Sequence, residues 1–154
     1  HGDFVVYETA AITRYVDRVF EGVALMPEDA VSLARMDQVI AIADNYVYWP
    51  MVRQAYAHGV LRKQAGIDWD KDLVEEGLRA AEPVLKVLDE MASEGWVLNG
   101  LRISLADCHV APMAAAFANL PEGRKMIDRH WALSRWLEWV CHSRAYRHAK
   151  GETG

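Results

Sequence analysis

The stretch from residue 99 to residue 118 constrains the fold of this chain more than any other. An Asn-Gly turn opens it, and Ser104 and Asp107 follow at the spacing of a helix capping box. In such a box, the Ser104 hydroxyl accepts from the Asp107 N–H, and the Asp107 carboxylate accepts from the Ser104 N–H. Residues 105–118 are almost wholly apolar, so the sequence predicts a buried central helix. We therefore assign Ser104 and Asp107 a structural role as a cap.

The composition of the chain argues against several classes of protein. The chain has 154 residues, 52% of them hydrophobic and 25% charged, with a net charge of −5. This length suits one domain with an ample core. We expect no nucleic-acid partner, because no basic stripe is present, and no membrane association, because no apolar run approaches ~20 residues. Two cysteines do not make a disulfide framework, and their helical, apolar settings suit a reducing cytoplasm.

Apolar spacing predicts one short strand and then helices. The strand is expected over Asp3–Tyr7, and a helix follows over Ala10–Phe20. After a linker at 21–26, we expect a long helix from Pro27 to Tyr48, since proline suits the first helical position. Pro50 should end or kink this helix, and the helical pattern resumes over residues 51–63.

The second half predicts four further helical segments. A stripe that begins at Val74 and ends at Ala92 predicts a helix that starts near Asp70 and bends at Pro83 without breaking. The capped central helix, a short helix from about Pro121 and a final amphipathic helix come next. The tail at 147–154 is polar and is expected to be loose. The sequence thus predicts an all-α bundle of about six helices over residues 27–146, preceded by a strand and a helix at 1–20.

Three separated motifs resemble the glutathione transferase family. They are the Ile-Ser-Leu-Ala-Asp run at 103–107, the Val-Tyr-Glu-Thr-Ala-Ala-Ile-Thr-Arg-Tyr-Val run at 6–16 and the Leu-Ser-Arg-Trp-Leu-Glu-Trp-Val run that opens the closing segment at 133–146. Arg144 departs from the family, which often has proline there. The resemblance implies that residues 1–20 are the last strand and helix of a thioredoxin-like domain, that 21–26 link them to the family's C-terminal helical domain, and that the rest of the thioredoxin-like domain is not in this chain.

The resemblance also implies a function and sites. A parent enzyme would add glutathione, as a co-substrate, to small apolar electrophiles in detoxification, and it would be a homodimer. Glu8 and Thr9 would bind the γ-glutamyl end of glutathione: the carboxylate pairs with the ammonium, and the hydroxyl and nearby N–H groups donate to the carboxylate. The acceptor pocket would draw on aromatic and apolar residues of the proline-containing helix, namely Tyr46, Tyr48, Trp49, Val52 and Tyr56.

Plainer interpretations remain open for each site. Glu8-Thr9 could also be an ordinary helix N-terminus with an exposed acidic residue and no ligand. The aromatic residues could equally belong to a core or an interface. Another function is possible too: a non-catalytic glutathione transferase-like interaction module, or an unrelated bundle that binds an apolar ligand.

We expect no catalytic residue and no metal or other cofactor within this chain. Cys108 lies among apolar residues, where a thiol stays neutral. Its neighbour His109 points about 100° away on a helix and cannot serve as its base. Cys141 and His142 have the same relation, and the histidines show no metal-binding spacing. The thiol-activating group of the family would lie in the part of the thioredoxin-like domain that precedes residue 1, so the chain alone should be inactive.

Overall fold

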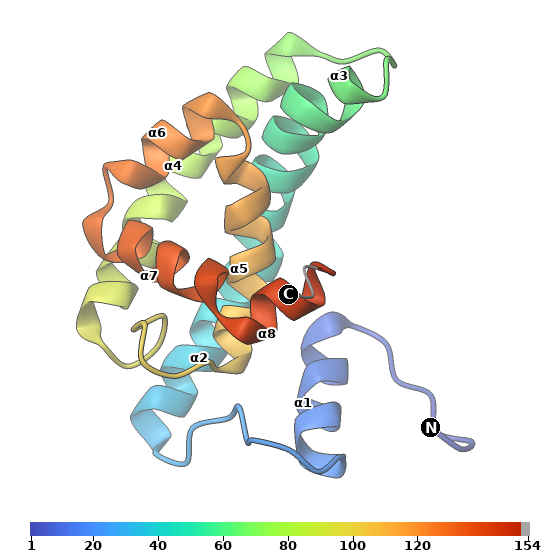
Figure 1. Cartoon of the computed structure of the whole chain (residues 1–154), viewed down its shortest axis with the longest axis vertical. Helices are drawn as coiled ribbons and strands as arrows, with labels where there is room; N and C mark the ends of the chain where they lie inside the picture. The colour runs from blue at the N-terminus through green and yellow to red at the C-terminus, as the bar shows by residue number, and fades with distance from the viewer. Residues whose placement is uncertain (152–154) are drawn as a thin grey trace.

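Every regular element of the chain is a helix in residues 1–151, the part that the computed structural model describes. The elements are α1 (Thr9–Val19), α2 (Ala30–Ile42), η1 (Ala43–Leu61), α3 (Arg62–Gln64), α4 (Lys71–Glu94), α5 (Leu105–Ala118), α6 (Pro121–Asp128), α7 (Trp131–His142) and α8 (Arg144–Ala149). Because α2, η1 and α3 run on as one continuous helix, the region after residue 27 holds six helical rods (Figure 1). The prediction of an all-α bundle is confirmed.

The strand predicted over Asp3–Tyr7 is not formed. Residues 4–7 are irregular and pair with no other strand in the described part of the chain, since that part contains none. A strand needs a partner for its backbone groups, and alternating side chains alone do not supply one. Phe4 instead packs its ring against Tyr15 of α1, with 5.1 Å between the ring centroids.

The helix predicted from Pro27 begins three residues later, at Ala30. Asp29 is the N-cap, and its carboxylate accepts a hydrogen bond from the Ser32 N–H at 2.8 Å. A carboxylate at an N-cap satisfies one of the unpaired donors of the first turn, whereas Pro27 offers only a suitable φ. The stronger local signal therefore sets the start, and residues 21–29 all belong to the connection.

Pro50 neither ends nor breaks the long helix. Residues 43–61 form a π-helix, in which a backbone N–H bonds to the carbonyl five residues earlier, as the Arg62 N–H does to Ala57. The wider turn accommodates a proline that would interrupt the ordinary ladder. The π-helix also changes the spacing of the residues that face the core. Buried residues recur at every fourth position: Ala43, Val47, Met51, Ala55 and Gly59.

The helices α4 and α5 follow their sequence signals closely. Asp70 caps α4, and its side chain accepts from the N–H groups of Asp72 and Leu73. Gly95 ends α4 with a φ of 82°, a left-handed conformation that glycine adopts without steric cost. Pro83 lies on the exposed side of α4 and the helix continues across it.

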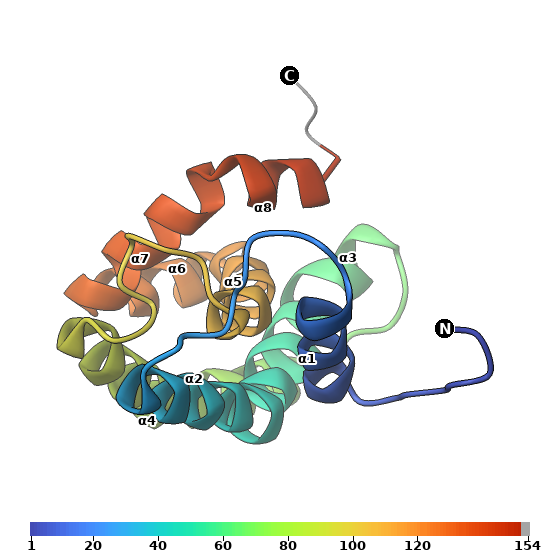
Figure 2. The same ribbon diagram turned by 90° about the horizontal axis from the view of Figure 1, so that it is seen from below.

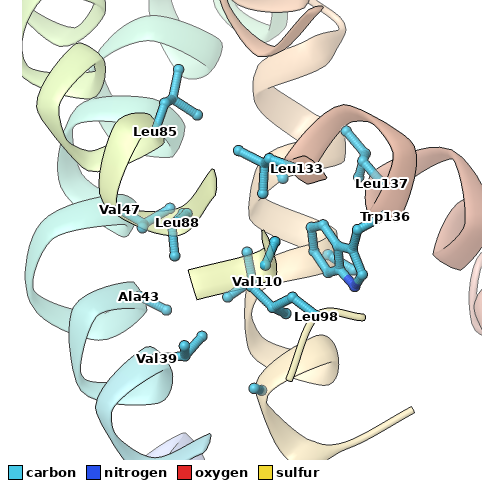
Figure 3. Packing of buried hydrophobic residues seen from close by; sticks show 14 of the residues in the cluster. Val39, Ala43, Val47, Leu85, Leu88, Leu98, Val110, Leu133, Trp136 and Leu137 are labelled. Carbon is cyan, nitrogen blue, oxygen red and sulfur yellow. The ribbon is translucent and has the colours of Figure 1, made fainter. Parts of the chain in front are cut away.

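The core lies where the long helix, α4, α5 and α7 meet. Figure 3 shows side chains of α2, η1 and α4 that point toward those of α5, α7 and Leu98. Trp136 and Phe117 are the largest fully buried side chains. In contrast, α1 has no buried residue and stands at the edge of the bundle, with the N-terminal segment extending away from it (Figures 1 and 2).

The tail is more ordered than predicted near its start. Ser143 caps α8, with its hydroxyl accepting from the Tyr146 N–H at 3.2 Å, and the helix runs to Ala149. A serine cap and alternating Arg, Tyr and Ala residues are good helix signals that the polar composition concealed. Residues 152–154, the rest of the predicted loose tail, lie outside the described residues. Among the described residues, no helix has both the length and the apolar character of a membrane span.

Candidate functional site

The predicted cap at Ser104 and Asp107 is present and holds more than its own helix. The capping box forms, and Asp107 Oδ2 accepts from the Ser104 N–H at 2.8 Å and from the Ser104 hydroxyl at 2.6 Å. The other carboxylate oxygen accepts from Trp136 Nε1 at 2.7 Å. All three residues are buried, so these bonds form away from water. The bond to Trp136 joins α5 to α7, and the sequence pattern did not predict it.

The Glu8-Thr9 pair lies at the N-terminus of α1. Glu8 is the N-cap residue, but its side chain makes no capping bond and is exposed. Its backbone has φ 72° and ψ 122°, which is unfavourable for a residue with a side chain. Such strain costs about 1–3 kcal/mol and tends to gather at ligand sites. Thr9 opens the helix beside it, so a carboxylate, a hydroxyl and first-turn N–H groups are presented together at one exposed point.

The five predicted pocket residues are not brought together. Tyr46, Tyr48 and Trp49 are exposed to 62%, 42% and 61%, and Val52 is half-buried. Of the five, Tyr56 alone lines one of the larger cavities found in the described part of the chain.

Tyr56 borders an open groove of about 490 Å³ between η1, α5 and the α7–α8 corner. Its floor is apolar, with Pro112, Ala115 and Leu137, while Arg124, Glu138 and His142 supply charge or hydrogen-bonding groups along the wall. A groove of this size accommodates a small molecule with an apolar body and a polar end. Sequence reasoning missed its α5, α7 and α8 side, because those residues are far from Tyr56 in the chain.

His109 directs its ring nitrogens to Thr13 and Asp44 and not to the neighbouring Cys108 thiol. Cys108 is exposed, contrary to the buried position expected, yet burial of its sulfur and the charges of Asp107 and Asp17 raise the pKa of its thiol. His109 turns the other way and is buried, with Nε2 3.3 Å from Thr13 Oγ1 and Nδ1 3.4 Å from Asp44 Oδ1. No group of three or more potential metal ligands occurs within residues 1–151.

Comparison with known proteins connects these features. No protein-family model matches the chain. It is 26% identical over 138 residues to glutathione S-transferase F7 of Arabidopsis thaliana, covering 88% of this chain and 65% of that protein. It is 24% identical over 143 residues to glutathione S-transferase psoE of Aspergillus fumigatus, covering 93% of this chain and 58% of that protein. The chain is similar to these glutathione transferases over most of its length.

Solved glutathione transferases share the fold. The apo structure of glutathione S-transferase III superposes with a TM-score of 0.83 at 22% identity, over 98% of this chain and 69% of that one. Glutathione transferase F7 of Populus trichocarpa gives 0.80 at 20% identity, over 100% of this chain and 73% of that one. The helical bundle matches the family's C-terminal domain, and the chain spans just under two thirds of the length of the curated relatives in Arabidopsis.

Proposed function

We propose that this chain is the larger part of an enzyme that conjugates glutathione to small, largely apolar electrophiles. In this proposal, Glu8 and Thr9 bind the γ-glutamyl end of glutathione, and the groove beside Tyr56 forms part of the wall for the acceptor. The observation that carries the proposal is the strained, uncapped Glu8-Thr9 pair at the start of α1, in a chain whose relatives are glutathione transferases.

The chemistry of the pair suits an amino acid headgroup. A γ-glutamyl group carries an ammonium and a carboxylate on one carbon. The exposed Glu8 carboxylate can accept from the ammonium, and no capping bond competes for it. The Thr9 hydroxyl and the N–H groups of the first turn of α1 can donate to the carboxylate, where the helix dipole also favours negative charge. One relative of known structure was solved with lactoylglutathione bound, which agrees with a glutathione-type ligand.

The acceptor side is supported by shape and polarity. The groove is lined by Tyr56 and by the apolar residues Pro112, Ala115 and Leu137. Catalysis in such a site consists of lowering the thiol pKa of glutathione and holding the thiolate against the acceptor at ~3–3.5 Å. Cys108, the exposed thiol, has a raised pKa and is therefore a poor candidate for assisting that step.

Glutathione titration followed by two-dimensional NMR tests the site directly. We expect weak, millimolar binding, since only γ-glutamyl contacts are available on this chain, with shifts confined to the amides around residues 8–12. Glu8→Gln and Thr9→Val should each abolish the shifts. Glu28→Gln provides the matched control, because Glu28 is also an exposed acid in the segment before a helix and should leave binding unchanged.

An assay with an aromatic halide acceptor completes the test. The chain alone should give no turnover above the rate of the solution reaction, because its described residues supply no assigned thiol-activating group. Binding that survives both Glu8→Gln and Thr9→Val would contradict the proposed site. Complete absence of glutathione binding, together with capture of a protein partner, would favour the non-catalytic interaction module.

A further inference from the structure

We infer that His109 is a positioning residue: it fixes the first turns of α1 on the helical bundle and so orients the Glu8-Thr9 pair. The inference rests on the proposed function for what the pair binds, but the attachment of α1 can be measured separately. It concerns a buried histidine that contributes to neither the cap nor the groove.

The helix α1 is held by few contacts. It has no buried residue, and several of its apolar side chains are half exposed, including Ile12, Val16 and Val19. Packing therefore contributes little to its placement. Polar contacts must do more of this work, and they come from His1 before α1, from α2, from the connection after α1 and from α5.

Of these contacts, the one with α2 lies at the surface and one ties α1 to the connection that follows it. Arg14 pairs with Asp37 of α2, with the two side chains 33% and 49% exposed. Asp17 accepts from the Leu25 N–H at 2.7 Å, which ties the end of α1 to the connection that follows it. Exposed ion pairs are worth ~0–1 kcal/mol, and a contact within the same connection does not orient the start of the helix.

The contact with His109 is partly buried and reaches the turn that follows Glu8-Thr9. His109 Nε2 lies 3.3 Å from Thr13 Oγ1, and the His109 side chain is 1% exposed. The Thr13 hydroxyl is 2.9 Å from the carbonyl oxygen of Thr9, which can accept its hydrogen. The bond between Thr13 and His109 can run in either direction: the Thr13 oxygen accepts when Nε2 carries a hydrogen, and the Thr13 hydroxyl donates when Nε2 carries none. In the first case, His109 is connected through one hydroxyl to the backbone of Thr9 itself.

The other side of the imidazole is anchored in the bundle. His109 Nδ1 faces Asp44 Oδ1 of η1 at 3.4 Å, and the residue itself is part of α5. The chain of contacts therefore runs from Asp44 through His109 and Thr13 to Thr9, across three elements. Both ring nitrogens face oxygen atoms, so the ring is oriented from both sides. A buried histidine needs hydrogen-bond partners whatever its role. A histidine with no positioning role could find those partners within the bundle, whereas His109 also contacts the loosely attached α1.

Hydrogen exchange of the α1 amides measures this attachment. Thr13→Val removes the hydroxyl at nearly constant volume and leaves the bundle untouched. We expect exchange in residues 13–19 to become about tenfold faster while the exchange of α4 and α5 is unchanged. Thr13→Ser, which keeps the hydroxyl, should restore the wild-type rate. His109→Phe should loosen α1 to the same extent, and Thr13→Val should add nothing to it.

Matched variants and a second readout make the result decisive. Arg14→Met, which removes the surface pair, should change α1 exchange by less than Thr13→Val does. In the glutathione titration, Thr13→Val should weaken binding several-fold, although it touches neither Glu8 nor the Thr9 side chain. Unchanged α1 exchange in both Thr13→Val and His109→Phe would overturn the inference. If glutathione does not bind the wild-type chain at all, the proposed function fails, whereas the exchange result still decides the role of His109.

Discussion

At the scale of single residues, Asp107 is the most connected polar side chain of the core. It accepts two bonds from Ser104 and one from Trp136. The bond from the Ser104 N–H followed from the three-residue spacing, because a capping box is a local motif. The third did not, because Trp136 lies 29 positions away and its indole could meet any buried acceptor. Local bonds were thus predictable from sequence, and long-range ones were not.

Removing the Asp107 carboxylate should therefore cost more than an ordinary cap. We expect Asp107→Ala to lower the free energy of unfolding by about 3 kcal/mol, since it leaves buried donors unpaired on both Ser104 and Trp136. Ser104→Ala should cost only about 1 kcal/mol, because it keeps the bond from the Trp136 indole. Urea denaturation gives both values, and refolding of Asp107→Ala should be slower if the cap forms early. Equal midpoints for Asp107→Ala and wild type would contradict this role.

The Cys108 thiol provides a prediction about pH. Burial first, and then the negative charges of Asp107 and Asp17, raise its pKa above the ordinary value of 9.0. At pH 8 the folded chain should react with iodoacetamide more slowly than the urea-unfolded chain, because less thiolate is present. The difference should shrink as the pH rises through the folded-state pKa.

Asp17→Asn isolates the contribution of one charge to this pKa. In a Cys141→Ser background, where Cys108 is the remaining thiol, the substitution should lower the pKa and speed alkylation at pH 8. Asparagine keeps an oxygen that can accept from the Leu25 N–H, so the fold of the connection is preserved. A slower reaction in Asp17→Asn would contradict the electrostatic explanation.

At the scale of elements, the helices with strong local caps were predicted best. Asp70 and Gly95 bound α4 as expected, and its apolar stripe is in register with the core. The long helix was predicted less well, because the outcome at Pro50 depends on whether the neighbouring helix supports a widened turn. The strand at 4–7 failed for a similar reason: pairing is a property of two segments, and a sequence pattern describes one.

The contact between η1 and α4 at Pro50 leads to an element-scale prediction. A Cβ added at Gly77 would lie 2.5 Å from the Pro50 carbonyl oxygen and 2.8 Å from the Ala55 nitrogen, both backbone atoms. Gly77→Ala should therefore destabilise the fold by about 2 kcal/mol or more, although alanine favours a helix by ~1 kcal/mol. Gly95, whose φ is 82°, is a different case, since a Cβ there meets nothing within 4 Å.

Thermal denaturation of Gly77→Ala and Ala80→Gly separates the steric effect from the effect of helix propensity. Gly77→Ala should lower Tm by separating η1 from α4, and it should also raise the exchange rates of amides near Pro50. The exposed Ala80→Gly variant in the same helix reports the propensity effect alone and should cost ~1 kcal/mol. A Gly77→Ala variant as stable as wild type would show that the two helices can move apart at no cost.

At the scale of the whole molecule, the fold followed from the sequence but the candidate site did so only in part. The family motifs located Glu8-Thr9 correctly at a helix start, because a sequence motif fixes its own local structure. The groove around Tyr56 joins η1 to α5 and α7, and its far wall could not be identified from one apolar stripe. The contact of His109 with Thr13, on which the inferred orientation of α1 rests, joins positions 96 residues apart and could not be identified from a local pattern either.

The exposed apolar surface around α1 leads to a prediction about association. Phe4, Val5 and Tyr7 are 53%, 81% and 78% exposed, and Val16 of α1 and Phe20, which follows α1, are 46% and 53% exposed. Residues 4–7 pair with no strand in the described part of the chain, so their backbone can pair with a second copy. We expect the chain to self-associate in a concentration-dependent way through this surface, because dimerisation would remove apolar area from water.

In sedimentation velocity, Val5→Lys combined with Val16→Lys should shift the chain to monomer, while Val31→Lys, on the equally exposed start of α2, should not. A wild-type chain that stays monomeric at high micromolar concentration, or one whose association is blocked only by Val31→Lys, would contradict the assignment of the α1 surface.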